Sequence, residues 1–323
     1  MAIEKVMILG NWELCLSIIN AIFPPQYSKP GTAEYQVTVL TYPSQTLSLP
    51  PHVSPSDVQH QKSDYTSTSL QSAMTGQDLV ISTMSGGDSD QQIRIVDAAV
   101  AAGVKRFIPD EFSHDSMNEH IRGRIPKYAG RAKVIAHLQK IPKDHPDFEW
   151  TAIATGYTLD TQLISGNMGF DMEWHSATIH GTGTEPFSAS SLERVGQIVV
   201  RTIQHWDEIK NQYTYAAGMI TSANEVLRSA EKATGHEFTV GNYDVQECIA
   251  EGQKRIEKGY PDSGMFLLER SVLYDKTLEA SRPFKDRSAN NTMGLTPESV
   301  EVVVSTAYHD FKHHGKPGCG CSS

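Results

Sequence analysis

The sequence lacks several features that would assign it to a special class of protein. Its 323 residues contain four cysteines, too few for a disulfide framework, which fits a reducing compartment. The net charge is −10 at pH 7, and no dense run of Lys and Arg marks a nucleic-acid footprint. Asn11, Glu13 and Asn20 interrupt the N-terminal apolar run, which has no basic leader. We therefore expect a cytoplasmic protein with no membrane segment, no secretory signal and no nucleic-acid partner.

Glycine is scarce at one particular place. The segment 6–23, VMILGNWELCLSIINAIF, predicts a strand, a tight turn and an amphipathic helix. Dinucleotide-binding turns use three glycines, for the bend, for the approach of the pyrophosphate and for helix packing. Here only Gly10 is present, and Trp12 and Glu13 follow it. We expect the indole and the carboxylate to obstruct a diphosphate at the helix N-terminus.

Short apolar runs alternate with helical patterns through the first half of the chain. This alternation predicts an α/β fold with a doubly wound, parallel, Rossmann-like sheet, whose ligands bind at the carboxyl ends of the strands. We expect strands over 6–9, 37–41, 58–62, 78–83, 104–109 and 148–154, and helices over 70–76, 91–102 and 127–140.

The second half is richer in glycines, aromatic residues and short elements. We expect a Rossmann-like domain over residues 1–156 and a smaller α/β substrate domain mainly within 157–312, with some helices returning to the sheet. Residues 313–323 are expected to form a flexible tail. Helices are predicted over 190–203, over 222–234 with Ser222 as N-cap, and over 296–311 with Pro297 at the first helical position.

Several motifs follow one another in a characteristic order, among them DLVISTMSGG, VKRFIPDEF, RAKVIAHLQK and WTAIATGYTLD. With them the chain resembles the NmrA-like and isoflavone-reductase-like family of atypical short-chain dehydrogenases, as a fungal-type member with a degenerate glycine loop. The resemblance covers almost the whole chain. It implies that NADPH binds in the first domain and that a lysine after the VKRFIP strand acts as acid/base. Alignment through A-K-V assigns that role to Lys133.

The chain departs from the family pattern at the cofactor site. Glu13 and Leu16 replace the second and third glycines, and the second strand ends in LTYP without a cation for a 2′-phosphate. A carboxylate about 4 Å from a phosphate costs a few kcal/mol at an effective dielectric near 20. A lost arginine contact removes roughly 1.5–3 kcal/mol more. We therefore expect no cofactor, or weakly bound NADP.

The resemblance and the expected strand ends together suggest the site residues. A substrate pocket is expected from Glu111, Phe112, Tyr157, Met168 and Phe170. A cofactor, if retained, is expected to contact Gly10, Trp12, Thr41, Ser85 and Gly86. No metal site is expected, because the acidic residues and His114 after the fifth strand lack the paired-histidine spacing of a helical zinc site.

Three functions fit this sequence, and we predict the first of them. The first is a redox-neutral enzyme of secondary metabolism, an isomerase, cyclase or dehydratase that acts on an aromatic or polyketide-like small molecule, with Lys133 as acid/base. The second is an NADPH-dependent reductase with a divergent loop. The third is a non-enzymatic NmrA-type regulator. A homodimer is compatible with all three.

Overall fold

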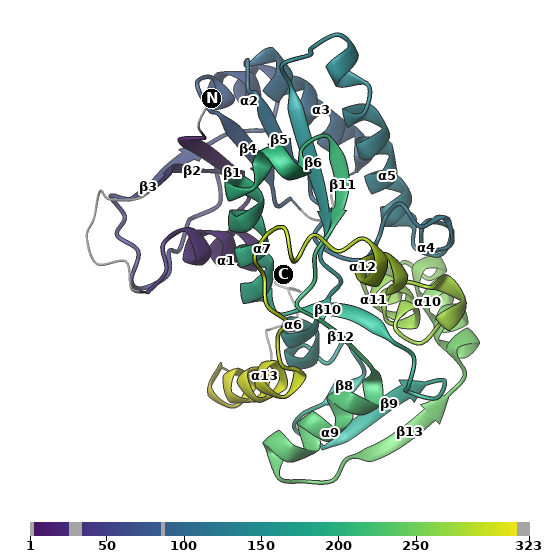
Figure 1. Ribbon diagram of the computed structural model, residues 1–323. Coiled ribbons are helices and arrows are strands. Elements are labelled where there is room, and N and C mark those ends of the chain that lie inside the picture. Colours follow the sequence, from purple (N-terminus) through teal and green to yellow (C-terminus); the bar gives the residue numbers. More distant parts are fainter. Residues whose placement is uncertain (1–2, 26–33, 85–87, 315–323) are drawn as a thin grey trace.

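A computed structural model describes residues 3–25, 34–84 and 88–314. Its centre is a seven-stranded sheet in the order β11-β6-β5-β4-β1-β2-β3, and every neighbouring pair is parallel (Figure 1). This confirms the predicted α/β fold with a parallel Rossmann-like sheet. The strands are β1 (Lys5–Leu9), β2 (Gln36–Thr41), β3 (Val58–Lys62), β4 (Leu79–Ser82), β5 (Arg106–Ile108), β6 (Glu149–Ala154) and β11 (Gln212–Tyr215).

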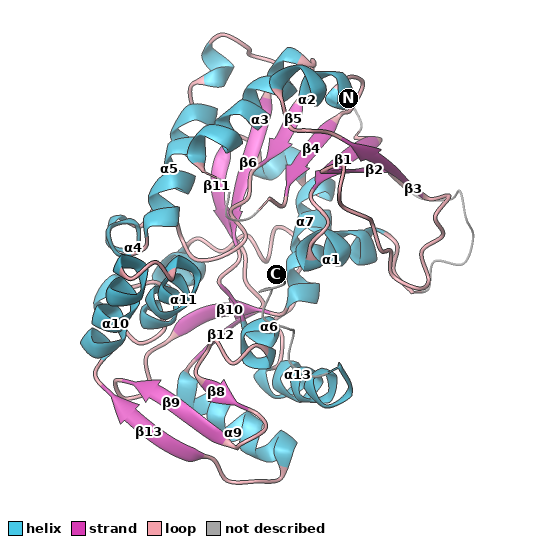
Figure 2. Ribbon diagram, turned by 180° about the vertical axis from the view of Figure 1, so that it is seen from behind, coloured by secondary structure: helices cyan, strands magenta, loops and turns pink. Residues whose placement is uncertain are grey.

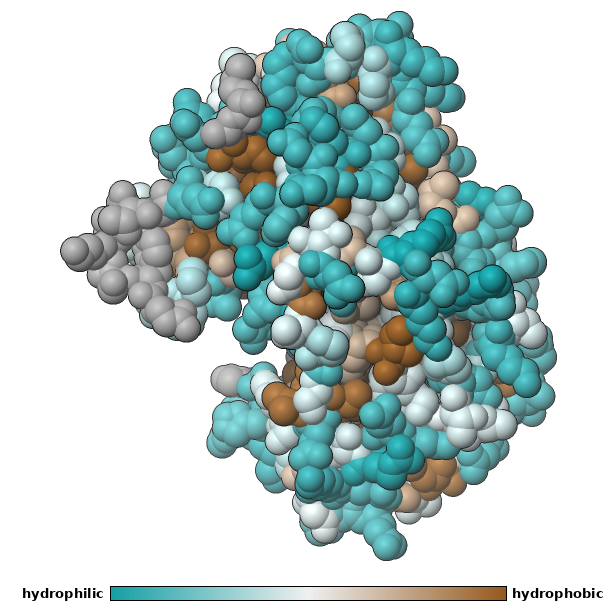
Figure 3. All heavy atoms as spheres, viewed as in Figure 1, coloured by the Kyte–Doolittle hydropathy of each residue, from teal (hydrophilic) through white to brown (hydrophobic). Residues whose placement is uncertain are grey.

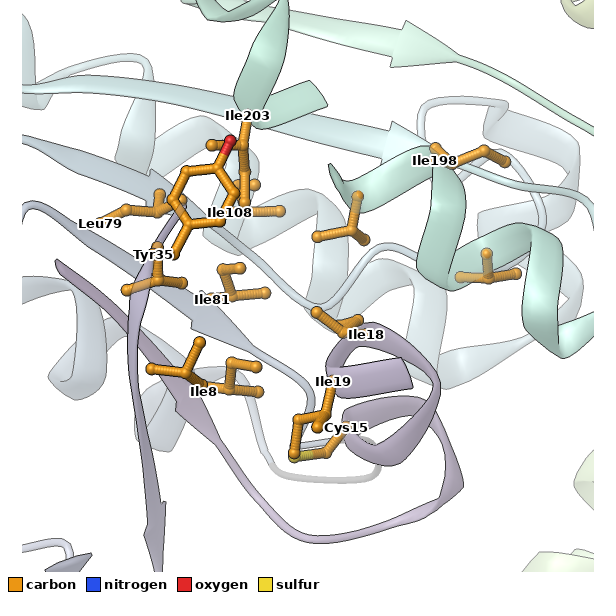
Figure 4. Packing of buried hydrophobic residues seen from close by; sticks show 14 of the residues in the cluster. Ile8, Cys15, Ile18, Ile19, Tyr35, Leu79, Ile81, Ile108, Ile198 and Ile203 are labelled. Carbon is orange, nitrogen blue, oxygen red and sulfur yellow. The ribbon is translucent and has the colours of Figure 1, made fainter. Parts of the chain in front are cut away.

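Helices cover both faces of the sheet because alternate side chains of each buried strand point to opposite sides. Ile8 of β1 joins the hydrophobic cluster under α1 (Glu13–Ile22), α7 (Leu192–Gln204) and α8 (Trp206–Ile209) (Figure 4). Met7 and Leu9 join the cluster on the other face. That face is covered by α2 (Ser67–Met74), α3 (Ser89–Ala101), α5 (Pro126–Leu138) and the short η1 (Ile141–Lys143).

A smaller α/β unit packs beneath the carboxyl edge of the central sheet (Figures 1 and 2). One small sheet contains β7 (Tyr157–Thr158), β10 (Phe187–Ser190) and β12 (Met219–Thr221), and the other contains β8 (Phe170–Asp171), β9 (Ser176–His180) and β13 (Thr239–Tyr243). The remaining helices are α4 (Glu119–Arg124), α6 (Leu159–Ile164), α9 (Ala223–Thr234), α10 (Val245–Glu257), α11 (Pro261–Val272), η2 (Lys276–Leu278), α12 (Arg282–Asp286) and α13 (Val300–His314).

The chain passes more than once between the two units. After β10 it returns to the central sheet through α7, α8 and β11, which pairs with β6. The helix predicted over 190–203 therefore packs against the first domain, where α7 contacts α1 closely. Gly196 permits this contact, because a Cβ at that position would lie 2.4 Å from the carbonyl oxygen of Ser17.

The prediction for the last helix was wrong at its start. α13 begins at Val300, three residues after Pro297. Glu298 stays outside the helix because its N–H donates to the carbonyl of Gly218 at 2.7 Å, and its carboxylate accepts two hydrogen bonds from Ser191. These tertiary contacts outweigh the local preference of proline for the first helical turn.

Hydrophilic residues cover most of the face shown in Figure 3, and a notch opens at the left edge of this view, between α1 and α13. Within the described residues we find no helix with both the length and the apolar character needed to cross a membrane.

Candidate functional site

Gly10, in the turn between β1 and α1, has a backbone conformation that favours glycine. Gly10 has φ +106°, and its N–H donates to the carbonyl of Leu40 at 2.9 Å. A Cβ at this position would lie 2.9 Å from Oγ1 of Thr83, so both conformation and space require glycine. The first of the three expected glycine functions is therefore retained.

The N-terminus of α1 is open. Trp12 occupies the N-cap position without a capping hydrogen bond from its side chain, and 66% of its surface is exposed. The indole therefore does not pack into the turn. Glu13, the first residue of the helix, is also exposed, and the N–H groups of Glu13 and Leu14 donate to no described residue. The obstruction of a diphosphate by Trp12 and Glu13 stays a prediction, and both side chains lie at the N-terminus of α1.

A cation lies near the end of β2 although the β2 sequence contains none. Lys62 is paired with Thr41 in the β2–β3 register, and its Nζ donates to the carbonyl of Pro43 at 2.9 Å. Thr41, predicted as a cofactor contact, is buried, and its Oγ1 lies 2.8 Å from Nε2 of His60. The sequence analysis did not consider Lys62 because it looked for a cation on β2 itself, whereas Lys62 lies on the neighbouring strand.

A small cavity lies beyond the ends of β4 and β5, and we call it the β5 cavity. It encloses about 30 Å³, enough for one or two water molecules but not for an aromatic ring. Its walls come from the segments after β4 and β5 and from α3 and α5, and they include Met84, Pro109, Asp110, Glu111, Lys127 and Arg131. The predicted pocket residue Glu111 is thus one of its lining residues.

Two charged pairs give this cavity its chemistry. Arg131 donates from Nη2 to Oδ2 of Asp110 at 2.9 Å, while its Nη1 is buried and has no hydrogen-bond partner in the described part of the chain. Burial alone would lower the pKa of Arg131, but Asp110, Tyr128 and Glu111 outweigh it and raise the pKa. Lys127 pairs with Glu269 at 2.6 Å. An unpaired guanidinium N–H in a buried cavity is suited to bind a negatively charged oxygen.

Glu111 is almost completely buried, and burial raises its pKa to about 7. Its Oε2 accepts hydrogen bonds from Ser116 at 2.6 Å and from Tyr213 at 3.0 Å, and Arg131 opposes part of the burial effect. The carboxyl group therefore changes its charge near neutral pH. His114, which the sequence analysis considered only as a metal ligand, is buried and stacks on Tyr157 with 5.7 Å between ring centroids. Burial lowers its pKa to about 4, so it is neutral.

Lys133 does not line the β5 cavity. On α5 the lining positions 127, 130, 131 and 134 repeat at helical spacing and form one face. Lys133 falls outside this face, and its side chain is exposed. The lysine that lines the cavity is Lys127, one and a half turns earlier. The assignment of Lys133 as acid/base stays a prediction that this geometry does not support.

The other predicted pocket residues are buried in hydrophobic clusters. Phe112 packs in the cluster beneath α1 and α7. Tyr157, Met168 and Phe170 belong to the core of the smaller unit and expose 4% or less of their surface. None of the four lines the β5 cavity. Ser85 and Gly86 lie outside the described residues.

A larger hollow, the interdomain groove, begins on the other side of the β1–α1 turn. It has a volume of about 690 Å³, within the range of small-molecule sites. Side chains from α1, α6, α7, α11 and α13 line it, among them Glu13, Leu16, Asp160, Ile164, Leu192 and Phe266. The β1–α1 turn lies close to lining residues of both hollows, since a Cβ at Gly10 would lie 3.7 Å from Met84 of the β5 cavity and Glu13 lines the groove.

No group of three or more His, Cys, Asp or Glu side chains in the described ranges is arranged to hold a metal ion. The hydrogen-bond donors and the two charged pairs of the β5 cavity are therefore the groups that give the site its polar character.

Comparisons with known proteins agree with this architecture. The chain is 30% identical over 310 residues to the oxidoreductase poxI of Penicillium oxalicum. This alignment covers 93% of this chain and 96% of poxI. A solved isoflavone reductase superposes with a TM-score of 0.71 at 18% identity, covering 94% of this chain and 99% of the other. The leucoanthocyanidin reductase of Vitis vinifera, solved as a binary complex with NADPH, gives 0.72 at 15% identity, with 94% and 99% covered. The model of the NmrA-like family matches residues 34–258. The chain therefore belongs to the NmrA-like family.

Proposed function

We propose that the protein is an NADPH-dependent reductase that acts on a small molecule at the carboxyl edge of the central sheet. The observation that carries this proposal is the β1–α1 turn, in which Gly10 has a positive φ and the N–H groups of Glu13 and Leu14 donate to no residue that the structure describes. The similarity to poxI, an oxidoreductase by name, over 93% of the chain supports a reductase-like enzyme.

The residues at the turn fit a dinucleotide phosphate. Uncapped N–H groups at a helix N-terminus bind anions, and the helix dipole adds to the attraction. Glu13 opposes this, but its side chain is exposed, so its repulsion at about 4 Å is on the order of 1 kcal/mol in water rather than several. The ammonium of Lys62 beside β2 supplies a counter-charge of the kind that distinguishes a 2′-phosphate from a hydroxyl.

Bound NADPH supplies a hydride to the substrate. The chain's own residues supply the other half of the chemistry, the stabilisation and protonation of the substrate oxygen that becomes negative. The free Nη1 of Arg131 stabilises that oxygen, and Nζ of Lys127 gives it a proton. Lys127 is the better donor because its side chain is 31% exposed, whereas Glu111 exposes 1% and is held by Ser116 and Tyr213.

The β5 cavity is too small for a whole substrate, so we assign it to the reacting oxygen alone. The interdomain groove has the size and the partly apolar lining, with Leu16, Ile164 and Phe266, for the body of an aromatic or polyketide-like molecule. A redox-neutral isomerase, cyclase or dehydratase stays the second candidate. The observation that favours it is the carboxylate of Glu13 at the first position of α1, where a diphosphate would have to pass.

Calorimetric titration with NADPH and NADH separates the two candidates. We expect NADPH to bind with micromolar or tighter affinity and NADH to bind more weakly. Lys62→Met should weaken NADPH binding about tenfold and leave NADH unchanged, because a charged contact of about 1.5 kcal/mol is lost. Lys258→Met, which removes an exposed lysine after α10, is the matched control. If neither dinucleotide binds to the folded protein, the reductase proposal fails and the redox-neutral candidate replaces it.

A further inference from the structure

One ion pair joins the proposed proton donor to the smaller unit. Nζ of Lys127 on α5 lies 2.6 Å from Oε1 of Glu269 on α11, and α11 packs near the lower end of α5 beside α4 (Figures 1 and 2). Lys127 lines the β5 cavity, whereas Glu269 does not. The ion pair therefore links a carboxylate of the smaller unit to a lysine in the wall of the cavity.

The surroundings of Glu269 keep its carboxylate charged. Burial alone would raise its pKa, but Lys127, its hydrogen bond to the carboxylate, and the nearby Arg131 outweigh burial and lower the pKa. The side chain is 10% exposed. A buried carboxylate needs a cation within contact distance, because its desolvation is otherwise uncompensated. Contact with the ammonium of Lys127 therefore compensates for the burial of the carboxylate.

Tyr128 fixes the direction of this pair. Its hydroxyl lies 3.4 Å from Oε1 of Glu269 and 2.7 Å from Oγ of Ser113. The carbonyl of Ser113 in turn accepts the N–H groups of Thr155 and Gly156, both at 3.0 Å, at the end of β6. Lys127 lies over the face of the Tyr128 ring, 5.7 Å from its centroid. The orientation of the ammonium is thus tied to the edge of the central sheet.

We propose that Glu269 is a positioning residue that holds the ammonium of Lys127 at the β5 cavity, so that the smaller unit contributes to the donor without touching the substrate. The inference rests on the proposed function for the role of Lys127. The proton moves as a simple transfer: the Nζ–H bond of Lys127 breaks as the substrate O–H bond forms, and the neutral amine takes a proton back from water. Glu269 stays ionised and keeps the amine in place between turnovers.

Amine labelling tests this arrangement without substrate or cofactor. We would treat the folded protein with trinitrobenzenesulfonate and follow the Lys127 peptide by mass spectrometry. In Glu269→Gln the amine loses its ion pair, and we expect Lys127 to react about fivefold faster. The matched control is Asp275→Asn, which breaks the similarly buried pair of Arg124 and Asp275 between α4 and the segment after α11, away from the cavity. It should leave Lys127 unchanged.

Glu269→Asp is a second variant in case E269Q does not fold. It keeps the negative charge but moves it away from Lys127 by one methylene. We expect an intermediate labelling rate. Equal rates in wild type, E269Q and E269D would overturn the proposal, as would equal acceleration in D275N. Because the readout needs no dinucleotide, it remains decisive if NADPH fails to bind. Once a substrate is known, E269Q should lower kcat with little change in KM or in NADPH affinity.

Discussion

The contact between α1 and α7 offers a sharp test of the structure, since it holds the helix whose N-terminus forms the proposed cofactor site. Gly196 of α7 packs against the backbone of α1. A Cβ added there would lie 2.4 Å from the carbonyl oxygen of Ser17, 2.5 Å from its Oγ and 2.7 Å from its carbonyl carbon. Two of these atoms belong to the backbone and cannot rotate away. The two helices would have to separate to accept Gly196→Ala.

The cost of that separation has two opposing contributions. Overpacking of a close contact typically costs about 1–3 kcal/mol. Alanine in place of glycine inside a helix returns up to about 1 kcal/mol through helix propensity. The hydrogen bond from Oγ of Ser17 to the carbonyl of Leu192, 2.6 Å long, spans the same interface and would be strained as well. We therefore expect Gly196→Ala to lower the free energy of unfolding by about 2 kcal/mol.

Urea denaturation followed by circular dichroism measures this directly. Gly123→Ala is the matched control, because Gly123 of α4 is also helical but has no atom within 4 Å of an added Cβ. It should leave stability unchanged or raise it by a few tenths of a kcal/mol, from propensity alone. A Gly196→Ala protein as stable as wild type, beside the expected control, would refute the packing that we describe between α1 and α7.

Three further predictions concern the site and its supports. Burial raises the pKa of Glu111 to about 7, so the protonated carboxyl stabilises the fold, and about 3 kcal/mol of the free energy of unfolding is lost as the pH rises from about 4.5 to 7. Glu111→Gln should remove this loss, and urea midpoints that fall equally between pH 5 and pH 8 in both proteins would count against it. Gly156→Ala should lower the free energy of unfolding by at least about 2 kcal/mol in the same assay, because φ is +76° and the added Cβ would lie 2.5 Å from the carbonyl oxygen of Ser188. A smaller decrease than that of Gly196→Ala would contradict this prediction. Lys127→Ala should reduce NADPH oxidation about a hundredfold and Lys133→Ala less than about twofold, and the reverse order would restore Lys133 as the acid/base.

The sequence predicted the central architecture well because the strands are encoded locally. The strand β3 has the bounds that the sequence predicts, residues 58–62. As expected, Ser222 caps α9, because its side chain accepts a hydrogen bond from the N–H of Glu225. Both depend on patterns within a few residues. The start of α13 was mispredicted because its determinants, the contacts of Glu298 with Ser191 and Gly218, come from residues distant in sequence.

The site was harder to predict because its members are brought together by the fold. Glu269 lies 142 positions after Lys127, and no local pattern connects them. The sequence analysis did not single out Arg131, because its role depends on a buried Nη1 that has no hydrogen-bond partner among the described residues, while Nη2 donates to Asp110. A helical projection of 127–134 was the one available signal, since it separates Lys127 and Arg131 from Lys133.

The β1–α1 turn shows why a residue type alone does not decide ligand binding. A missing glycine forbids a ligand only if the replacing side chain occupies the ligand's path, and an exposed side chain such as Trp12 need not do so. The same exposure reduces the charge penalty of Glu13 several-fold, because the energy scales inversely with the local dielectric. In our proposal, Lys62 of β3 supplies the cation that the sequence of β2 lacks. The balance therefore depends on terms of about 1 kcal/mol each, and the affinities for NADPH and NADH measure it.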